Sequence, residues 1–263
     1  MRLSGQILFI WFTLLLTVQG EPVLGARTKV IIRPVGDVVP ENVYGLCVPV
    51  RLSCDGVPVC IYDARLPEGE WVASLSADEL AARGVRLLGD VLPWWRRREL
   101  RLFLELCPPG APTLTPERQA ERELILQRAD SAACAAFAVV SDGACGCVQL
   151  AEKALQTAYD AGFRQGEVWL VADDAEVLAR YGGRSSKVPV CYLSPDGTCV
   201  AGARGLYLHR SRIESKAGVK RLRRGGRRVA VWDVNSAEDA EAVRDCGVDF
   251  IVTDDAGWID SER

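Results

Sequence analysis

The sequence predicts an α/β protein built as a single (β/α)8 barrel. Short β-rich runs alternate with amphipathic helical patterns, and this repeated strand-then-helix order is typical of a parallel sheet. The chain has 263 residues. With roughly 240 residues left after removal of a signal peptide, about eight such strands favour a barrel over an open sheet.

Apolar, β-branched runs define the strands. They cover residues 29–33, 46–52, 57–62, 101–107, 168–171, 188–193, 205–208, 229–234 and 250–253. The third run follows a turn at Asp55-Gly56, which is typical of a hairpin. Residues 137–141 fit either a strand or part of a helix.

Helical patterns lie between these runs, at 116–128, 149–163, 174–181, 219–224 and 236–246. Thr115 is a candidate N-cap before Pro116, and Ser236 is a candidate N-cap for the last helix. Glycines at 162, 182–183 and 225–226 are expected to end the helices before them.

Composition excludes several classes of function. Lys and Arg (32) are outnumbered by Asp and Glu (35), so no nucleic-acid partner is expected. A hydrophobic fraction of 49% supplies ample material for a core. The single histidine, His209, excludes mechanisms that need two imidazoles in one subunit, and it excludes a His-rich metal site.

The N-terminus predicts a signal peptide over residues 1–20. Arg2 precedes an apolar run at 7–18, and Val18-Gln19-Gly20 fits a cleavage site. We therefore expect an exported domain that begins near Glu21, with an uncleaved signal anchor as the alternative. No second stretch is long enough to span a membrane, so no transmembrane segment is expected after signal removal.

Ten cysteines accompany this signal, and in an exported protein an even number permits disulfides. Cys54 and Cys60 flank the Asp-Gly turn, where a bridge between strands is plausible. Cys60, Cys107 and Cys191 lie in apolar runs, where each fits a small buried hydrophobic residue equally well.

Two segments resemble the glycerophosphodiester phosphodiesterase family. Residues 229–254, VAVWDVNSAEDAEAVRDCGVDFIVTD, match the family's closing pattern V-x-V-W-T-V-N, a helix with D-A, then G-V-D-x-I-x-T-D. Residues 50–66, VRLSCDGVPVCIYDARL, are similar to V-R-L-T-x-D-G-x-P-V-x-x-H-D-x-x-L. The resemblance covers Lys29 to Trp258 and implies one TIM-barrel domain over residues 28–258, in agreement with the strand count.

The resemblance also implies an activity, the hydrolysis of a glycerophosphodiester to an alcohol and glycerol 3-phosphate in lipid metabolism. In the family, two histidines act as general acid and base, and carboxylates hold a divalent cation. Imidazole protonates the leaving alkoxide, and a hard cation on oxygen ligands neutralises the phosphoryl charge.

Most of these catalytic positions carry other residues here. The first histidine falls on Ile32, although the following arginine is present as Arg33. The second histidine falls on Tyr62, with Asp63 retained. The metal-binding E-x-D falls on Cys47-Val48-Pro49.

The third strand keeps Glu105 of its E-x-K but has Cys107 in place of the lysine, and Asp233 replaces a threonine beside Trp232. The remnants expected to contact substrate or phosphate are therefore Arg33, Asp63, Trp232 and Asn235, and the metal remnant is Glu105. A positioned acid or base contributes about 10²–10⁴-fold, and one carboxylate is far from the roughly six to eight oxygens of a Ca²⁺ site.

The front of the chain is shorter than the family pattern. Pro40-Glu41-Asn42 is similar to the family's P-E-N-T, but seven residues separate Asn42 from Val50, where the family has a helix. Little room lies between Pro93 and Arg101 as well. The first and second helices are therefore expected to be shortened or missing, either because the barrel is trimmed or because the gene model lacks a segment.

His209 follows a short strand, so it can lie at the functional rim of the barrel, although a lone histidine is more often a surface or satisfied residue. A basic cluster precedes the seventh barrel strand, and it comprises Lys220, Arg221, Arg223, Arg224, Arg227 and Arg228. This cluster is expected on the amino-end face, as a solvated surface or as a contact for an anionic membrane or glycan.

Two further features remain open. Trp94-Trp95, followed by three arginines, fits either a contact with a lipid headgroup layer or a plug in the shortened flank of the barrel. The acidic residues at the barrel mouth could form a pocket floor lined by Trp232 and Asn235; they are Glu105, Asp63, Asp233 and Asp254.

The sequence thus predicts a barrel that binds a ligand but does not catalyse its hydrolysis. The expected ligand is a glycerol-phosphate-like small molecule or a lipid headgroup; a protein partner is also open, and no cofactor is expected. One alternative is an active hydrolase with relocated residues, which would use Ca²⁺ or Mg²⁺. Another is a non-catalytic surface or structural protein held by disulfides.

Overall fold

The computed structural model describes residues 28–34, 39–40, 42–107, 146–255 and 257–260. Several predictions lie outside these residues: the signal peptide at 1–20, the helix at 116–128, the segment at 137–141, and any pairing of Cys134 or Cys145.

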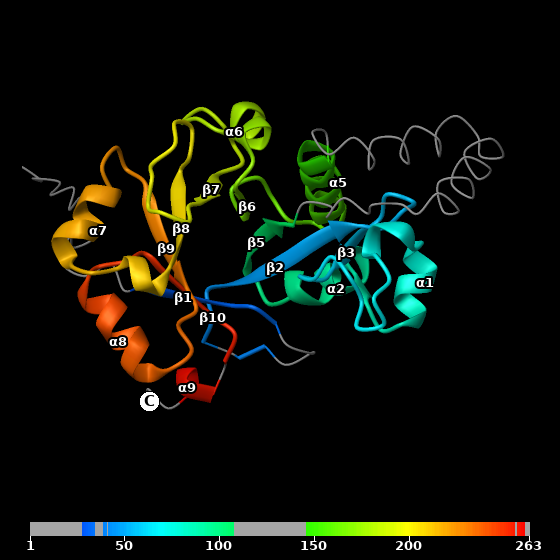
Figure 1. Ribbon diagram of the computed structural model, residues 1–263, viewed down its shortest axis with the longest axis horizontal. Coiled ribbons are helices and arrows are strands. Elements are labelled where there is room, and N and C mark those ends of the chain that lie inside the picture. Colours follow the sequence, from blue (N-terminus) through cyan, green and yellow to red (C-terminus); the bar gives the residue numbers. More distant parts are fainter. Residues whose placement is uncertain (1–27, 35–38, 41, 108–145, 256, 261–263) are drawn as a thin grey trace, which may run out of the picture.

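Eight parallel strands of the described chain close into a barrel (Figure 1). They are β1 (Lys29–Ile32), β2 (Gly45–Leu52), β5 (Arg101–Leu106), β6 (Val168–Ala172), β7 (Val190–Leu193), β8 (Gly205–His209), β9 (Arg228–Trp232) and β10 (Phe250–Thr253). The barrel closes because β1 pairs in parallel with both β10 and β2. The predicted (β/α)8 class is confirmed, and the strand bounds agree to within a few residues.

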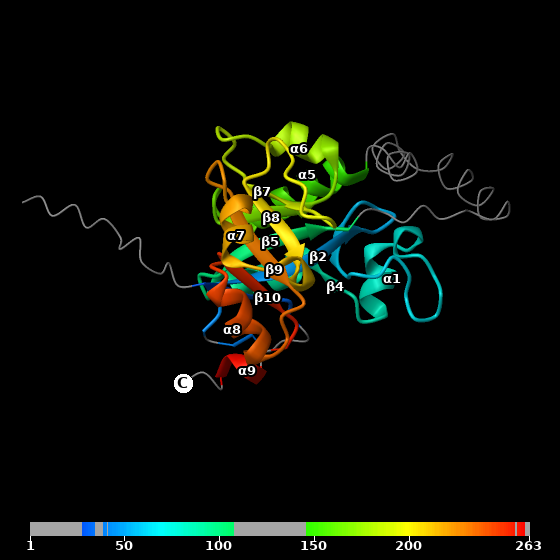
Figure 2. The ribbon, with the colours of Figure 1, turned by 60° about the vertical axis from the view of Figure 1, so that its left-hand side comes forward.

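The segment between β2 and β5 adds a small antiparallel extension to the barrel. β3 (Pro58–Cys60) pairs with β2, and β4 (Arg86–Leu87) pairs with β3. The 3-10 turn Val72–Ser74 and α1 (Ala77–Ala82) cover this hairpin, with a separate apolar cluster around Val59 and Leu80. The run predicted at 57–62 is therefore a strand outside the barrel, labelled near α1 in Figure 1, and Figure 2 shows its partner β4 next to α1.

The helices that surround the barrel are α2 (Leu88–Arg96), α5 (Gly146–Asp160), α6 (Ala175–Tyr181), α7 (Lys216–Leu222), α8 (Ala237–Asp245) and the short α9 (Gly257–Asp260). Figure 1 shows α7 and α8 on one side of the barrel and α1 on the opposite side. Asp174, Ser215 and Ser236 cap α6, α7 and α8, as each side chain accepts a hydrogen bond from a backbone N–H of the first turn.

The second helix, which was expected to be shortened or missing, is present as α2, with Pro93 inside it. Proline removes one helical hydrogen bond, and here packing outweighs this loss. Trp95 is buried in the core, whereas Trp94 is 42% exposed. Trp95 therefore fills this flank of the barrel, as one of the two alternatives for the tryptophan pair predicted. The first helix is a separate matter: the described residues between β1 and β2 form no helix.

The core has two layers. Outside the strands, aliphatic side chains of the barrel pack against the helices. Inside the barrel, the cluster is richer in aromatic residues, and the ring of Phe103 lies 5.6 Å from Trp169 and 5.5 Å from Phe250. In β1, Ile31 belongs to this inner cluster and Ile32 to the outer layer, as expected for a strand whose side chains alternate between its two faces.

All eight cysteines in the described part of the chain are unpaired. The expected bridge between Cys54 and Cys60 is therefore wrong, because the register of β2 with β3 places Cys60 opposite Val50, four residues before Cys54. Cys107 and Cys191 are buried, in agreement with their reading as small hydrophobic residues.

The basic cluster lies at the amino ends of the strands, as predicted. Asp249, just before β10, accepts hydrogen bonds from Arg223 at 3.1 Å and from Arg228 at 2.7 Å. In the part of the chain that the structure describes, no helix has the length and apolar character needed to cross a membrane.

Candidate functional site

The carboxyl ends of the barrel strands form a mouth, and its first half centres on Arg33, just after β1. One guanidinium nitrogen of Arg33 donates to Glu105 at 3.1 Å and to the Tyr207 hydroxyl at 2.8 Å. The other terminal nitrogen donates to Asp254 at 3.4 Å. The side chain of Glu105 is only 6% exposed, so its charge is compensated mainly by Arg33. We call this group, with Cys47, the Arg33 half.

Cys47 and Tyr207 complete the Arg33 half beneath the guanidinium. The Cys47 thiol donates to Glu105 at 3.4 Å and lies 3.5 Å from the Tyr207 hydroxyl. Burial, reinforced by neighbouring charge, raises the pKa of both groups well above their ordinary values, so both stay protonated at neutral pH. A protonated thiol is a poor nucleophile, which leaves Cys47 a structural hydrogen-bond donor.

The second half of the mouth centres on His209, at the end of β8. Its Nε2 lies 3.0 Å from Asp233 Oδ2, and its Nδ1 lies 2.8 Å from Ser211 Oγ. The backbone N–H of Ser211 also donates to Nδ1, at 3.2 Å. We call the group of His209, Ser211, Arg212 and Asp233 the His209 half.

These contacts assign the tautomer of His209. A backbone N–H can only donate, so Nδ1 carries the lone pair and Nε2 carries the proton that is donated to Asp233. Asp233 adopts a left-handed backbone conformation, with φ of 65°. Such a conformation is uncommon outside glycine and is concentrated at functional sites.

Trp232 lies between the two halves. Its ring centroid is 4.6 Å from the imidazole of His209 and 5.8 Å from the guanidinium carbon of Arg33. The indole Nε1–H of Trp232 is buried without a hydrogen-bond partner, and so is Nε–H of Arg33. Buried donors are normally satisfied, so these two lack the acceptor that such a group usually has, and of the two residues Trp232 also lines the pocket described next.

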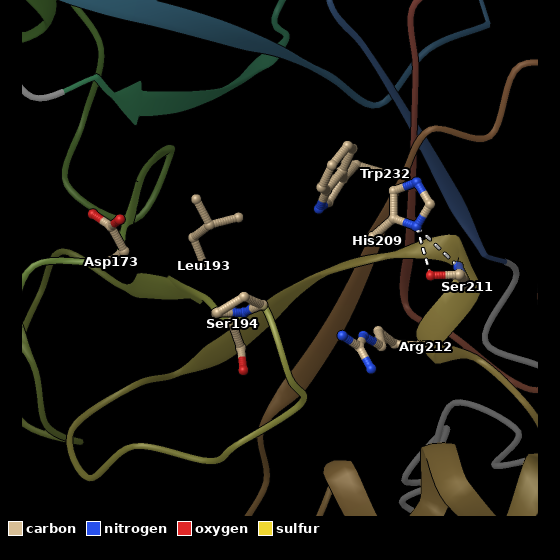
Figure 3. Close-up of a pocket in the computed structure, with 8 residues that line it drawn as sticks. Asp173, Leu193, Ser194, His209, Ser211, Arg212 and Trp232 are labelled. Atoms are coloured by element: carbon tan, nitrogen blue, oxygen red, sulfur yellow. Dashed lines mark hydrogen bonds between the residues drawn. The ribbon is translucent and has the colours of Figure 1, made fainter.

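A pocket of about 380 Å³ opens beside the His209 half. Its lining comprises Asp173, Leu193, Ser194, Pro195, His209, Ser211, Arg212 and Trp232. Figure 3 shows the indole nitrogen of Trp232 and the guanidinium of Arg212 on the side of this pocket. A volume of this size is sufficient for a small ligand.

The structure places some of the residues predicted from the sequence at the mouth and others elsewhere. Arg33, Glu105 and Asp254 converge, as expected for the mouth. Asn235 accepts from the Thr253 hydroxyl at 3.1 Å and from the Asp254 N–H at 2.9 Å, so it clamps the end of β10.

Three other predicted positions do not join the mouth in the expected way. Asp63 is exposed, and Tyr62 is 58% exposed with its ring 5.9 Å from the Arg33 guanidinium carbon. Ile32 faces the helices, so this position does not open on the barrel interior. Sequence reasoning missed Ser211 and Arg212, whose signal was their place directly after a barrel strand.

The described residues do not fit a divalent cation. Glu105, the expected metal remnant, is paired with Arg33. Within the described ranges, no three His, Cys, Asp or Glu side chains are grouped so that they could hold a metal ion. The predicted acidic floor is thus divided: Glu105 and Asp254 share Arg33, whereas Asp233 contacts His209.

The fold is similar to that of glycerophosphodiester phosphodiesterases of known structure. A phosphodiesterase from Oleispira antarctica, in complex with the product sn-glycerol-3-phosphate, superposes with a TM-score of 0.64 at 14% identity, over 89% of this chain and 95% of that chain. A glycerophosphodiester phosphodiesterase from Parabacteroides distasonis gives a TM-score of 0.59 at 21% identity, over 86% and 92%.

No family model matches the sequence, and neither does any curated protein. The comparisons therefore establish a TIM-barrel fold shared with glycerophosphodiester phosphodiesterases, which agrees with the resemblance found in the sequence.

Proposed function

We propose that the barrel mouth binds a small phosphorylated polyol, of which glycerol 3-phosphate is the simplest, and that it has lost metal-dependent phosphodiester hydrolysis. The ion pair between Arg33 and Glu105 carries this proposal. A divalent cation at Glu105 would have to displace a guanidinium that is already held by three hydrogen bonds. The side chain of Arg33 thus supplies internally the positive charge that a cation would bring.

The charge of the two halves suggests how such a ligand would lie. Arg33 is matched by Glu105 and Asp254, so this half offers no net positive charge to a phosphate. Arg212, in contrast, forms no ion pair with any residue that the structure describes, and it lines the pocket. The phosphate is therefore expected beside Arg212 and the free indole N–H of Trp232.

The polyol end is then expected to point toward Arg33. Its hydroxyl groups can donate to Asp254, the partner of Arg33 whose side chain is 43% exposed. The Oleispira antarctica structure with sn-glycerol-3-phosphate gives independent support for this class of ligand on this fold.

Calorimetric titration of the purified domain with glycerol 3-phosphate, in buffer with EDTA, tests the proposal. Binding is expected without added metal. Arg212→Met is expected to weaken it about 10–100-fold, because a hydrogen bond to a charged group contributes about 1.5–3 kcal/mol. The matched control is Arg224→Met, on the amino-end face. Equal affinity of the Arg212 variant and the wild type would contradict this placement, and the absence of any binding would contradict the function.

A further inference from the structure

We propose that Ser211 is a nucleophile activated by His209 and positioned for attack on an ester in the adjoining pocket. This reaction is different from metal-dependent phosphodiester hydrolysis, and it goes beyond ligand binding. The proposal stands on the chain of contacts from Ser211 Oγ to His209 Nδ1, at 2.8 Å, and from His209 Nε2 to Asp233 Oδ2, at 3.0 Å.

The direction of the hydrogen bonds fits a base beside a hydroxyl. Because Nε2 donates to Asp233, Nδ1 presents its lone pair to the Ser211 hydroxyl, which therefore donates to it. This is the arrangement that activates a serine: a neighbouring base accepts the hydroxyl proton, and a third group orients the base. The imidazole nitrogens have exchanged places relative to the most familiar triads, but the roles depend on geometry rather than on atom names.

Asp233 is the positioning residue of this chain. It receives a second contact from Arg210 Nε at 3.4 Å and a third from the Asn235 side-chain amide at 3.3 Å. These donors, together with its left-handed backbone, fix the carboxylate against His209. A fixed carboxylate holds the imidazole in one tautomer and stabilises the imidazolium that forms when His209 takes a proton.

The pocket supplies room for a substrate and donors for a developing negative charge. Ser211 and His209 both line it, next to the apolar side chains of Leu193 and Pro195. The buried N–H of Trp232 has no partner, and the guanidinium of Arg212 lies on the same side (Figure 3). Donors that face the site of a developing oxyanion are a large source of catalysis in acyl transfer.

In the proposed reaction, Ser211 Oγ forms a bond to the carbonyl carbon of a carboxylic ester while its proton passes to His209 Nδ1. The ester C–O bond then breaks, and the leaving alkoxide takes that proton, which leaves an acyl-serine and a free alcohol. Water next attacks the acyl carbon and gives a proton to His209. The bond between the acyl carbon and Ser211 Oγ then breaks, Oγ takes the proton back from His209, and the carboxylic acid is released.

A biotinylated fluorophosphonate tests the nucleophile directly. Ser211 Oγ would bond to phosphorus as fluoride leaves, and mass spectrometry would map the adduct on the wild-type protein without reference to any variant. We expect labelling at Ser211, complete loss of it in Ser211→Ala, and at least a 100-fold slower rate in His209→Gln. Ser215→Ala is the matched control, because it removes a capping serine of the same segment outside the pocket lining, and its labelling should persist.

Asp233 is tested by a pair of variants. Asparagine tolerates a left-handed backbone, so Asp233→Asn should keep the fold while it loses the charge, and labelling should slow at least 10-fold. Asp233→Glu, which restores the carboxylate, should regain part of the rate. The proposal would be overturned if the folded wild-type protein is not labelled at Ser211, or if His209→Gln is labelled as fast as the wild type. The contact between His209 and Ser211 would then be only a cap of the short helix at Arg210–Arg212. Glycerol 3-phosphate binding in the same samples reports separately on the ligand site.

Discussion

The two halves of the barrel mouth differ in how far their charges are removed from water. In the Arg33 half, the side chains of Arg33 and Glu105 are 18% and 6% exposed, and most of their hydrogen-bonding capacity is used within the group. In the His209 half, His209 and Asp233 are 35% and 40% exposed and border a pocket. The first half is built as part of the core, whereas the second is reachable from solution.

This difference is the basis of both proposals, the loss of metal-dependent hydrolysis at the Arg33 half and the serine nucleophile in the His209 half. A carboxylate that is locked to a buried guanidinium is a structural element, because its removal would leave the guanidinium without a counter-charge. His209, in contrast, lines a pocket together with Ser211, the residue whose backbone and hydroxyl groups contact its Nδ1. The predictions below test this contrast, first through stability and then through binding.

The largest expected effect comes from Glu105→Ala. It leaves Arg33 buried beside the more exposed Asp254 alone, and breaking a buried pair from one side costs about 3–5 kcal/mol. Urea unfolding followed by circular dichroism measures this loss. Asp233→Asn is the matched change in the His209 half and should cost no more than about 1 kcal/mol, because its ion pair with Arg210 and its hydrogen bond from His209 are both partly exposed to water.

A double variant sharpens the same point. Replacement of both partners by apolar residues, Arg33→Met with Glu105→Leu, should recover most of the stability that Glu105→Ala loses, because no buried charge is left unpaired. If the double variant is as unstable as Glu105→Ala, the cost lies in packing, and the Arg33 half is not the buried ion pair described above.

An intermediate effect on the free energy of unfolding is expected from the thiols buried inside the barrel. Their ionisation tests whether water reaches the barrel interior beneath the two halves. Burial raises the pKa of Cys191 from 9.0 to about 12. Between about pH 9 and 12 the Cys191 thiol ionises in the unfolded protein but not in the folded one. The contribution of Cys191 to the free energy of unfolding is therefore complete below about pH 9 and is lost as the pH rises through this range. At pH 10 this loss is about 1.4 kcal/mol.

Urea midpoints at pH 8 and pH 10 check this value. Cys191→Ala should lose less stability between the two pH values than the wild type does, whereas Cys199→Ala, at an exposed position, should match the wild type. An identical pH dependence for both variants would mean that Cys191 is accessible to water.

The smallest effect is expected at Trp232, where the halves meet. Trp232→Phe keeps an aromatic ring against His209 but removes the unpartnered N–H. Glycerol 3-phosphate binding should weaken about 5–10-fold, which corresponds to one hydrogen bond of about 1–1.4 kcal/mol. The free energy of unfolding should change little, since no protein acceptor is lost. An unchanged affinity by calorimetry would show that the ligand does not use this donor.

Most of the fold could be predicted because its signals are local. Strand and helix periodicities, and caps such as Ser236, act within a few residues. The stretch between Pro93 and Arg101 predicted little room for a helix, whereas α2 begins before that proline, at Leu88, and places Trp95 in the core. The proposed bridge between Cys54 and Cys60 failed because strand register decides which residues face each other.

The site was predictable only in part. The resemblance to the phosphodiesterase family's motifs indicated Arg33, Glu105 and Trp232 as residues of the mouth. No local pattern indicated that Arg33 pairs with Glu105, 72 residues away, because only barrel closure brings the ends of β1 and β5 together. Ser211 was missed because a serine two residues after a histidine is common, and its meaning depends on the carboxylate that β9 places behind the imidazole.

The central claim is that Arg33 fills the role of the cation at Glu105. Calorimetric titration of the domain with Ca²⁺ and with Mg²⁺, with and without glycerol 3-phosphate, tests it most directly. We predict no metal binding tighter than about 1 mM and the same glycerol 3-phosphate affinity in EDTA as in either metal. Tight metal binding that raises this affinity, or that releases glycerol 3-phosphate from glycerophosphocholine, would contradict the account.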